Sequence, residues 1–248
     1  MLRLVAARAQ SGTRKFLFVL AMGAVSCGRP DPLPGLPRVM LWAWERPERM
    51  TFLDARAAGV AFLAGTVSWH GGRVEARPRY QPLEVPPGTA MAAVVRLESG
   101  AGPMPDAGEV AAEVLRAAAL PRVRALQIDF DARRSEREWY GELVRRVRRG
   151  MKTEMPLTIT ALASWCGSDS WITELPVADA VPMLFRMGAG EQRDVHQFAA
   201  GVCRSSLGVS TDEPLYAAPH GRRVWVFHPR AWTPEAYRAA MQIAGRWR

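Results

Sequence analysis

The sequence is poor in lysine, histidine and cysteine. Only Lys15 and Lys152 are lysines, so the formal net charge of +9 comes almost entirely from arginine. The arginines are spread along the whole chain instead of forming a basic block, which disfavours a nucleic-acid partner. The 4 histidines and 3 cysteines contain no pair with the spacing of metal ligands, so we expect no metal site.

Phosphate-binding loops and long apolar runs are also missing. No predicted strand is followed by G-x-G-x-x-G or by G-x-x-x-x-G-K-[ST], which argues against an open nucleotide-binding sheet. The apolar run in "FLFVLAMGAVSCG" holds about ten residues, too few to span a bilayer durably. We therefore expect no cofactor and no transmembrane helix.

The amino terminus has the layout of an export signal. Arg14 and Lys15 precede the apolar run, which ends in small residues and Cys27. The block "AVSC" resembles a bacterial lipoprotein processing box, in which Cys27 would carry the lipid. Plain signal-peptidase cleavage and a buried first helix are the alternatives. We predict that residues 1–27 are a signal peptide and that the protein is exported, either periplasmic or anchored to a bacterial envelope membrane through its lipid alone.

The segment 28–37, "GRPDPLPGLP", is rich in proline and glycine. Proline removes backbone donors and fixes φ, so we predict a tether here and a single folded domain over residues 38–248. In an oxidising compartment Cys166 and Cys203 could form a disulfide. Two unpaired buried thiols are the alternative.

From residue 38 onward, short apolar runs alternate with helical patterns. The predicted strands cover residues 39–44, 59–67, 91–98, 125–131, 156–164, 180–185, 207–211 and 223–228. The predicted helices cover residues 47–58, 107–119, 135–149, 191–204 and 234–246, with a short turn at 170–175. Such alternation implies parallel strands with right-handed crossovers, and eight repeats over about 210 residues fit a small (β/α)8 TIM-barrel-like fold. Residues 71–88 fit no helix and are interpreted as a β excursion after the second strand.

Two aspartates interrupt the fourth predicted strand, "ALQIDFD". Since strand residues alternate between faces, Ile128 and Phe130 are expected to face the helices, whereas Asp129 and Asp131 face the barrel interior near its carboxyl-terminal mouth. Barrel enzymes keep their sites at that mouth. The same alternation places Arg96 and Glu98 of the third strand nearby. An internal salt bridge between Arg96 and Asp129 that plugs the barrel is the alternative to a functional cluster.

Other strand ends supply further candidates for binding a substrate. Flat indole rings favour the apolar faces of sugars, which suggests a carbohydrate ligand, although core packing is the alternative for each ring. The candidate substrate-binding residues are Trp44, Glu45, Arg96, Trp165, Arg186 and Asp212.

Several ordered motifs resemble a known bacterial family. "AGVAFLAG", "LQIDFDA", "PLTITALASWC", "AVPMLFRMG" and "GVSTDEP" are similar to the family catalogued as domain of unknown function 3142, from residue 39 to near the carboxyl terminus. The resemblance implies a glycosidase-like barrel in exported or lipid-anchored proteins, without an assigned activity.

A second similarity is incomplete. "LQIDFDAR" is similar to the D-G-x-D-x-D-x-E strand of chitinase-type glycosidases, in which the last residue is the general acid. Asp129 and Asp131 match this pattern, but Arg133 occupies the position of the acid, and an arginine does not lose its proton. Hydrolysis by this strand in the chitinase manner is therefore excluded.

A glycosidase needs two carboxyl groups on opposite sides of the scissile bond. The i, i+2 pair on one strand does not obviously flank a sugar, so we predict that Asp131 works with Glu98 or Glu213 as acid, while Arg96 and Arg186 hold hydroxyls or an acidic substituent. The function predicted is glycoside hydrolase-like action on a polysaccharide or envelope glycan. The alternative is a non-catalytic carbohydrate-binding or scaffold lipoprotein.

Overall fold

The computed structural model describes residues 30–247 except 168, 170, 188–197 and 214–218. The predicted signal peptide and Cys27 lie outside these residues. The compact unit that holds the fold begins at Asp31.

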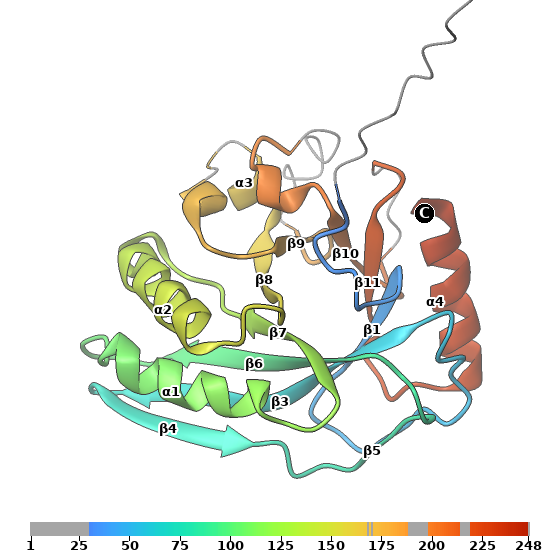
Figure 1. Ribbon diagram of the computed structural model, residues 1–248, viewed down its shortest axis with the longest axis horizontal. Helices are drawn as coiled ribbons and strands as arrows, with labels where there is room; N and C mark the ends of the chain where they lie inside the picture. Colours follow the sequence, from blue (N-terminus) through green and yellow to red (C-terminus); the bar gives the residue numbers. More distant parts are fainter. Residues whose placement is uncertain (1–29, 168, 170, 188–197, 214–218, 248) are drawn as a thin grey trace, which may run out of the picture. The chain divides into compact units, whose positions relative to one another are not determined.

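Eight parallel strands close into a barrel (Figure 1). They are β1 (Val39–Ala43), β3 (Gly59–His70), β6 (Met91–Ser99), β7 (Val123–Asp129), β8 (Leu157–Leu162), β9 (Asp179–Met183), β10 (Ser206–Ser210) and β11 (Arg223–Phe227). The order β1-β11-β10-β9-β8-β7-β6-β3 is completed by parallel pairing of β1 with β3, in which Met40 lies opposite Gly59. The predicted (β/α)8 TIM-barrel-like fold and all eight predicted strands are confirmed.

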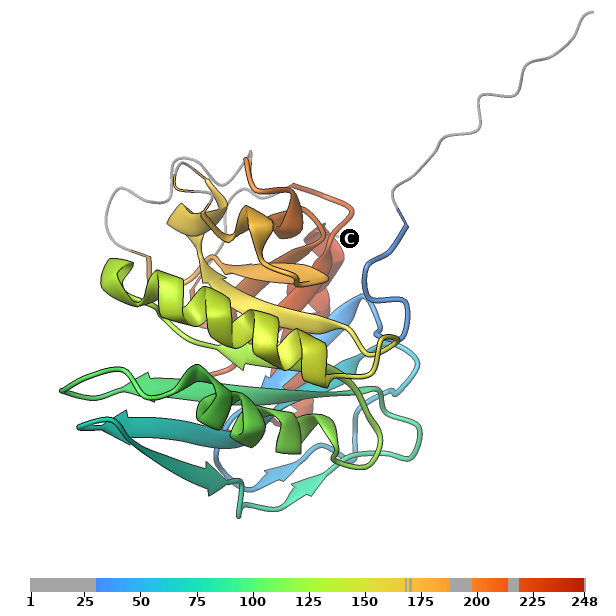
Figure 2. The same ribbon diagram turned by 60° about the vertical axis from the view of Figure 1, so that its left-hand side comes forward.

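Helices of unequal length follow several of the strands. They are α1 (Ala107–Ala118), η1 (Arg134–Glu136), α2 (Arg137–Gly150), α3 (Ala163–Cys166), η2 (Trp171–Glu174), η4 (Gly201–Cys203) and α4 (Pro234–Trp247). Both ribbon views show α1 and α2 side by side outside the barrel (Figures 1 and 2). Asp106 caps α1 by accepting the backbone N–H groups of Gly108 and Glu109. The helices predicted over residues 107–119, 135–149 and 234–246 are confirmed.

The helix predicted over residues 191–204 is not found where the chain is described. Residues 191–197 lie outside the described part, residues 198–200 are irregular, and only Gly201–Cys203 forms a 3₁₀ turn.

The helix predicted over residues 47–58 is wrong. The chain instead forms the short strand β2 (Glu48–Arg49), which pairs in parallel with β5 (Leu83–Glu84). The Glu48 carboxylate is buried and accepts the backbone N–H of Trp232, while the backbone N–H of Met50 donates to the Glu84 carbonyl at 2.8 Å. These long-range contacts outweigh the local helical pattern.

The predicted β excursion is confirmed. β4 (Arg73–Pro78) runs antiparallel to the second half of β3, after a turn in which Gly71 and Gly72 both have positive φ. Glycine adopts this left-handed backbone without the steric cost that a Cβ adds.

Two separate cores follow from the pleat of the strands. The larger core packs one strand face against the helices and includes Leu126, Ile128 and Phe130 of β7. The smaller core fills the barrel interior with large and small side chains in contact. Its members are Leu33, Leu36, Met40, Trp42, Ala61, Ala90, Ala92, Val94, Ala125, Val181 and Trp225.

The predicted tether over residues 28–37 is wrong for its second half. Leu33 is fully buried in the barrel interior, and the segment 31–37 closes the amino-terminal end of the barrel. Arg223 has no exposed surface and donates to the carbonyls of Leu33, Leu36 and Pro37 and to both carboxylate oxygens of Asp31. The domain therefore begins at Asp31 rather than at residue 38, because Arg223 at the start of β11 donates to backbone carbonyls of this proline-rich segment.

Asp179 lies buried at the same end of the barrel. It accepts a hydrogen bond from the Ser206 hydroxyl through Oδ2, while its Oδ1 has no hydrogen-bond partner among the described residues. Burial, more than the opposing influences of Ser206 and Arg223, raises the pKa of Asp179 to about 7. The folded protein therefore holds a proton at Asp179 over a pH range in which the unfolded chain has lost it.

This proton predicts a pH-dependent stability. The pKa of Asp179 is higher in the folded state than in the unfolded chain. The free energy of unfolding should therefore be highest below about pH 4 and should fall by about 4 kcal/mol as the pH rises to about 7. An Asp179→Asn variant has no carboxyl group to deprotonate, so this fall should be absent. The free energy of unfolding of the variant, relative to that of the wild type, should therefore increase as the pH rises. Urea unfolding at several pH values measures this difference, and parallel pH profiles for the two proteins would contradict it.

Candidate functional site

A cavity of about 320 Å³ opens at the carboxyl-terminal mouth of the barrel. Side chains from the ends of β1, β6, β7, β8, β9 and β11 line it. The lining residues are Trp42, Trp44, Val94, Arg96, Asp129, Asp131, Thr160, Leu162, Ala163, Met183, Phe185, Arg186, Met187 and Phe227. The sequence thus places two aspartates, two arginines and four aromatic rings at the end of the barrel where barrel enzymes in general bind substrates.

The acidic wall of the cavity consists of Asp129, Asp131 and Thr160. The Thr160 hydroxyl donates to Asp129 Oδ1 at 2.7 Å. Burial raises the pKa of Asp129, and the negative charge of Asp131 adds to this effect, whereas the Thr160 hydrogen bond opposes it. The inward orientation predicted for both aspartates is confirmed. Asp129 ends β7, and Asp131 lies just beyond the strand, exposed to solvent.

Another part of the lining is aromatic, and both cavity arginines lie over its rings. Phe185 and Phe227 stack with their centroids 5.5 Å apart and an interplanar angle of 3°, and Trp44 packs edge-on against Phe227 at 6.3 Å. The Arg96 guanidinium lies 5.4 Å from the Trp44 ring centroid, and that of Arg186 lies 5.3 Å from the Phe227 ring centroid. A ligand in the cavity would therefore meet carboxyl groups, aromatic rings and guanidinium groups, with Arg96 next to Asp129 in the strand register.

Trp42 and Gln127 form the base of the site. The Trp42 indole N–H donates to Gln127 Oε1 at 2.8 Å, and Trp42 packs against Phe185 and Trp225. Within the described part of the chain, Gln127 Nε2 is buried without a hydrogen-bond partner. The hydrogen bond from the Trp42 indole to Gln127 Oε1 holds the Trp42 ring in place beneath the cavity.

Glu98 and Glu213 are not among the residues that line the cavity. Glu98 binds Arg96, with its Oε1 2.9 Å from Arg96 Nε, and its side chain is half exposed. Glu213 Oε2 accepts the backbone N–H of Arg186 at 2.6 Å. Each glutamate thus holds a cavity arginine instead of facing Asp131 across the cavity. Arg96 pairs with Glu98, so the salt bridge to Asp129 that would plug the barrel does not form.

Three other candidates lie apart from the cavity lining. Glu45 binds Arg77 of β4 at 2.6 Å, and Asp212 accepts the Ser210 hydroxyl. Trp165 is only 2% exposed and packs against Trp171 with centroids 5.1 Å apart, in the core between strands and helices. The expectation that Trp165 faces the mouth is wrong, because β8 ends at Leu162 and α3 turns the indole away.

Sequence reasoning missed Thr160 and Phe227 as cavity residues. Both follow from strand alternation: Thr160 is two residues beyond the buried Thr158, and Phe227 is two residues beyond Trp225 in the barrel interior. The alternation used for β7 would have identified them on β8 and β11.

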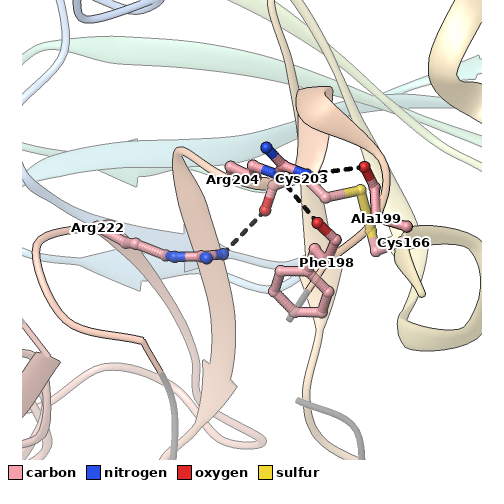
Figure 3. Close-up of a disulfide and its surroundings, with 6 residues drawn as sticks. All are labelled: Cys166, Phe198, Ala199, Cys203, Arg204 and Arg222. Atoms are coloured by element: carbon pink, nitrogen blue, oxygen red, sulfur yellow. Dashed lines mark hydrogen bonds between the residues drawn. A yellow bond between two sulfur atoms is a disulfide. The ribbon is translucent and has the colours of Figure 1, made fainter. Parts of the chain in front are cut away.

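A disulfide lies beside the cavity rim. Cys166 ends α3, whose first residue, Ala163, lines the cavity, and Cys166 is bonded to Cys203 of η4 (Figure 3). Arg222 donates to the Cys203 carbonyl, while Arg204 donates to the carbonyls of Phe198 and Ala199 (Figure 3). Of the two alternatives for these cysteines, the disulfide is the one that forms, and it joins the segments after β8 and β9.

Loss of this disulfide should lower stability markedly. The bond joins residues 37 positions apart, and a closed loop of that length corresponds to about 4 kcal/mol in the chain-entropy description. A Cys166→Ser/Cys203→Ser variant should therefore melt well below the wild type. Reductant should lower the wild-type Tm to that of the variant and leave the variant unchanged. Equal melting of both proteins without reductant would contradict the prediction.

Comparison of the chain with protein-family models, with curated proteins and with solved structures finds no match. Among the described residues, none of the helices combines the length and the apolar character that a bilayer crossing requires. In the same part of the chain, His, Cys, Asp and Glu side chains form no group of three or more that could hold a metal ion.

Proposed function

We propose that this protein is a glycoside hydrolase-like enzyme that acts on a polysaccharide or envelope glycan, with its active site at the mouth of the barrel. The observation that carries the proposal is the meeting of Asp129 and Asp131 with an aromatic wall in one open cavity. Flat rings bind the CH faces of sugars, and paired carboxyl groups are the groups that glycoside cleavage uses.

Asp129 is the better candidate for the general acid. Its raised pKa, caused first by burial and then by the charge of Asp131, keeps a proton available at a higher pH than an ordinary aspartate allows. Thr160 engages Oδ1 and leaves Oδ2 to donate to the leaving oxygen. This assignment replaces Glu98 and Glu213, which are bound to Arg96 and to the backbone of Arg186.

Asp131 then supplies the second carboxylate. It is exposed at the cavity and stands two residues beyond Asp129. In this arrangement Asp131 acts on the sugar or on an attacking water while Asp129 protonates the leaving group.

The cellular setting belongs to the same proposal. A disulfide between Cys166 and Cys203 is stable in an oxidising compartment and supports export. Residues 1–27 would then be the signal peptide, Cys27 the lipidated residue, and the lipid the sole membrane contact. The motif similarity to the domain of unknown function 3142 family fits this setting.

The test is a screen of wild-type protein for release of reducing ends from bacterial and plant polysaccharides, with an Asp129→Asn/Asp131→Asn protein as the matched control. The proposal expects turnover of at least one glycan by the wild type and none by the control. Binding of a glycan without turnover would select the non-catalytic carbohydrate-binding alternative and overturn the enzymatic proposal.

A further inference from the structure

Two arginines stand at the ends of one aromatic row across the cavity. Arg96 lies over Trp44, Trp44 packs against Phe227, and Arg186 lies over Phe227, with ring or guanidinium distances between 5.3 and 6.3 Å. The arginines come from β6 and from the end of β9, so they reach the row from different sides of the mouth. Positive charge is thus placed at two points of the cavity, and one of them, Arg96, stands on the strand next to Asp129.

The guanidinium of Arg186 is available to a ligand. Its side chain is exposed, and in the described part of the chain no carboxylate forms an ion pair with it, since Glu213 binds its backbone N–H instead. Arg186 adopts a φ of +54°, which places its backbone in the left-handed region that non-glycine residues avoid. Such strain concentrates at ligand-binding positions, where surrounding contacts maintain it.

Arg96 is only partly engaged. Its Nε lies 2.9 Å from Glu98 Oε1, and 42% of its side chain stays exposed. A guanidinium offers paired N–H groups that match the two oxygens of a carboxylate. Each arginine can therefore donate to a ligand carboxylate from its position over an aromatic ring.

The same arrangement disfavours a cationic sugar. An ammonium group would seek the ring faces of Trp44 and Phe227, but guanidinium groups already cover them and would repel it. A neutral sugar would leave the donors of both arginines to water. We infer that the cavity recognises a sugar unit bearing a carboxylate, a uronic acid, and that Arg186 and Arg96 bind this carboxylate; the inference rests on the proposed glycoside-acting function.

The test compares acidic oligosaccharides with their own neutral forms. Hexasaccharides of galacturonate, mannuronate and glucuronate type are each prepared intact and after chemical reduction of the carboxyl groups, which preserves ring and linkage. Binding is measured by calorimetry with the Asp131→Asn protein, so that no turnover interferes. At least one intact oligomer should bind about tenfold or more tightly than its reduced form. This preference should shrink as salt rises from about 50 to about 500 mM.

Arginine variants locate the preference. In the Asp131→Asn background, Arg186→Gln and Arg96→Gln should each reduce the preference for the intact over the reduced oligosaccharide by about tenfold. Arg116→Gln, on the exposed face of α1, should leave this preference unchanged. Equal or tighter binding of the reduced forms, tighter binding of a glucosamine hexamer, or no binding at all would overturn the inference. An acid preference without cleavage by the wild type would leave the inference standing and remove the enzymatic proposal.

Discussion

Asp131→Asn should lower turnover of a cleaved glycan by about a hundredfold to ten-thousandfold while the fold is retained. The carboxylate is exposed at the cavity, so the isosteric amide costs little stability, but it can neither attack nor accept a proton. Initial rates of reducing-end release, with circular dichroism melting of the same samples, measure both effects. Unchanged kinetics in the variant would contradict the role of Asp131.

The Asp129→Asn substitution should lower the turnover rate by a similar factor and should also change the dependence of that rate on pH. If Asp129 is the acid, deprotonation of Asp129 sets the alkaline limb of the wild-type profile. Thr160→Val is the matched probe, because the Thr160 hydrogen bond lowers the pKa of Asp129 and its loss should move that limb to higher pH. An alkaline limb that stays in place in Thr160→Val would assign the acid to another residue.

Arg223→Met should destabilise the folded protein by about 3 to 5 kcal/mol. The substitution keeps an unbranched chain in the barrel but removes the donors to three backbone carbonyls and to Asp31. Since such domains are stable by only about 5 to 15 kcal/mol, this loss is a large part of the total. Urea unfolding of wild type and variant gives the difference in free energy of unfolding.

The matched control is Arg49→Met. Arg49 is 81% exposed at its pair with Glu84, and an exposed pair of this kind contributes at most about 1 kcal/mol. A loss for Arg223→Met as small as that of Arg49→Met would mean that the segment 31–37 does not depend on Arg223 for its place at the end of the barrel.

The barrel could be predicted because the strand signal is local. Parallel strands buried on both faces read as apolar runs, and each of the eight runs formed a strand. The helix expected over residues 47–58 failed because Glu48 and Met50 bind partners far away in sequence, which no local pattern contains. The segment 31–37 was misjudged for the same reason, since its structure depends on Arg223 at the other end of the chain.

The candidate site could be predicted where strand alternation decides orientation. It placed Asp129 and Arg96 at the cavity correctly, and Asp131, two residues beyond the end of β7, also lines the cavity. Alternation no longer applies once the chain leaves a strand, which is why Trp165 was placed at the mouth although α3 buries it in the core. Which partner each glutamate selects also depends on side-chain packing between strands, as Glu98 and Glu213 illustrate.

The most direct measurement is a crystal structure of the Asp131→Asn protein with a bound oligosaccharide found in the substrate screen. The account predicts a sugar ring bound in the cavity lined by Trp44, Phe227 and Arg186, with a glycosidic oxygen within hydrogen-bonding distance of Asp129. An oligosaccharide bound elsewhere on the protein, with the barrel mouth empty, would contradict it.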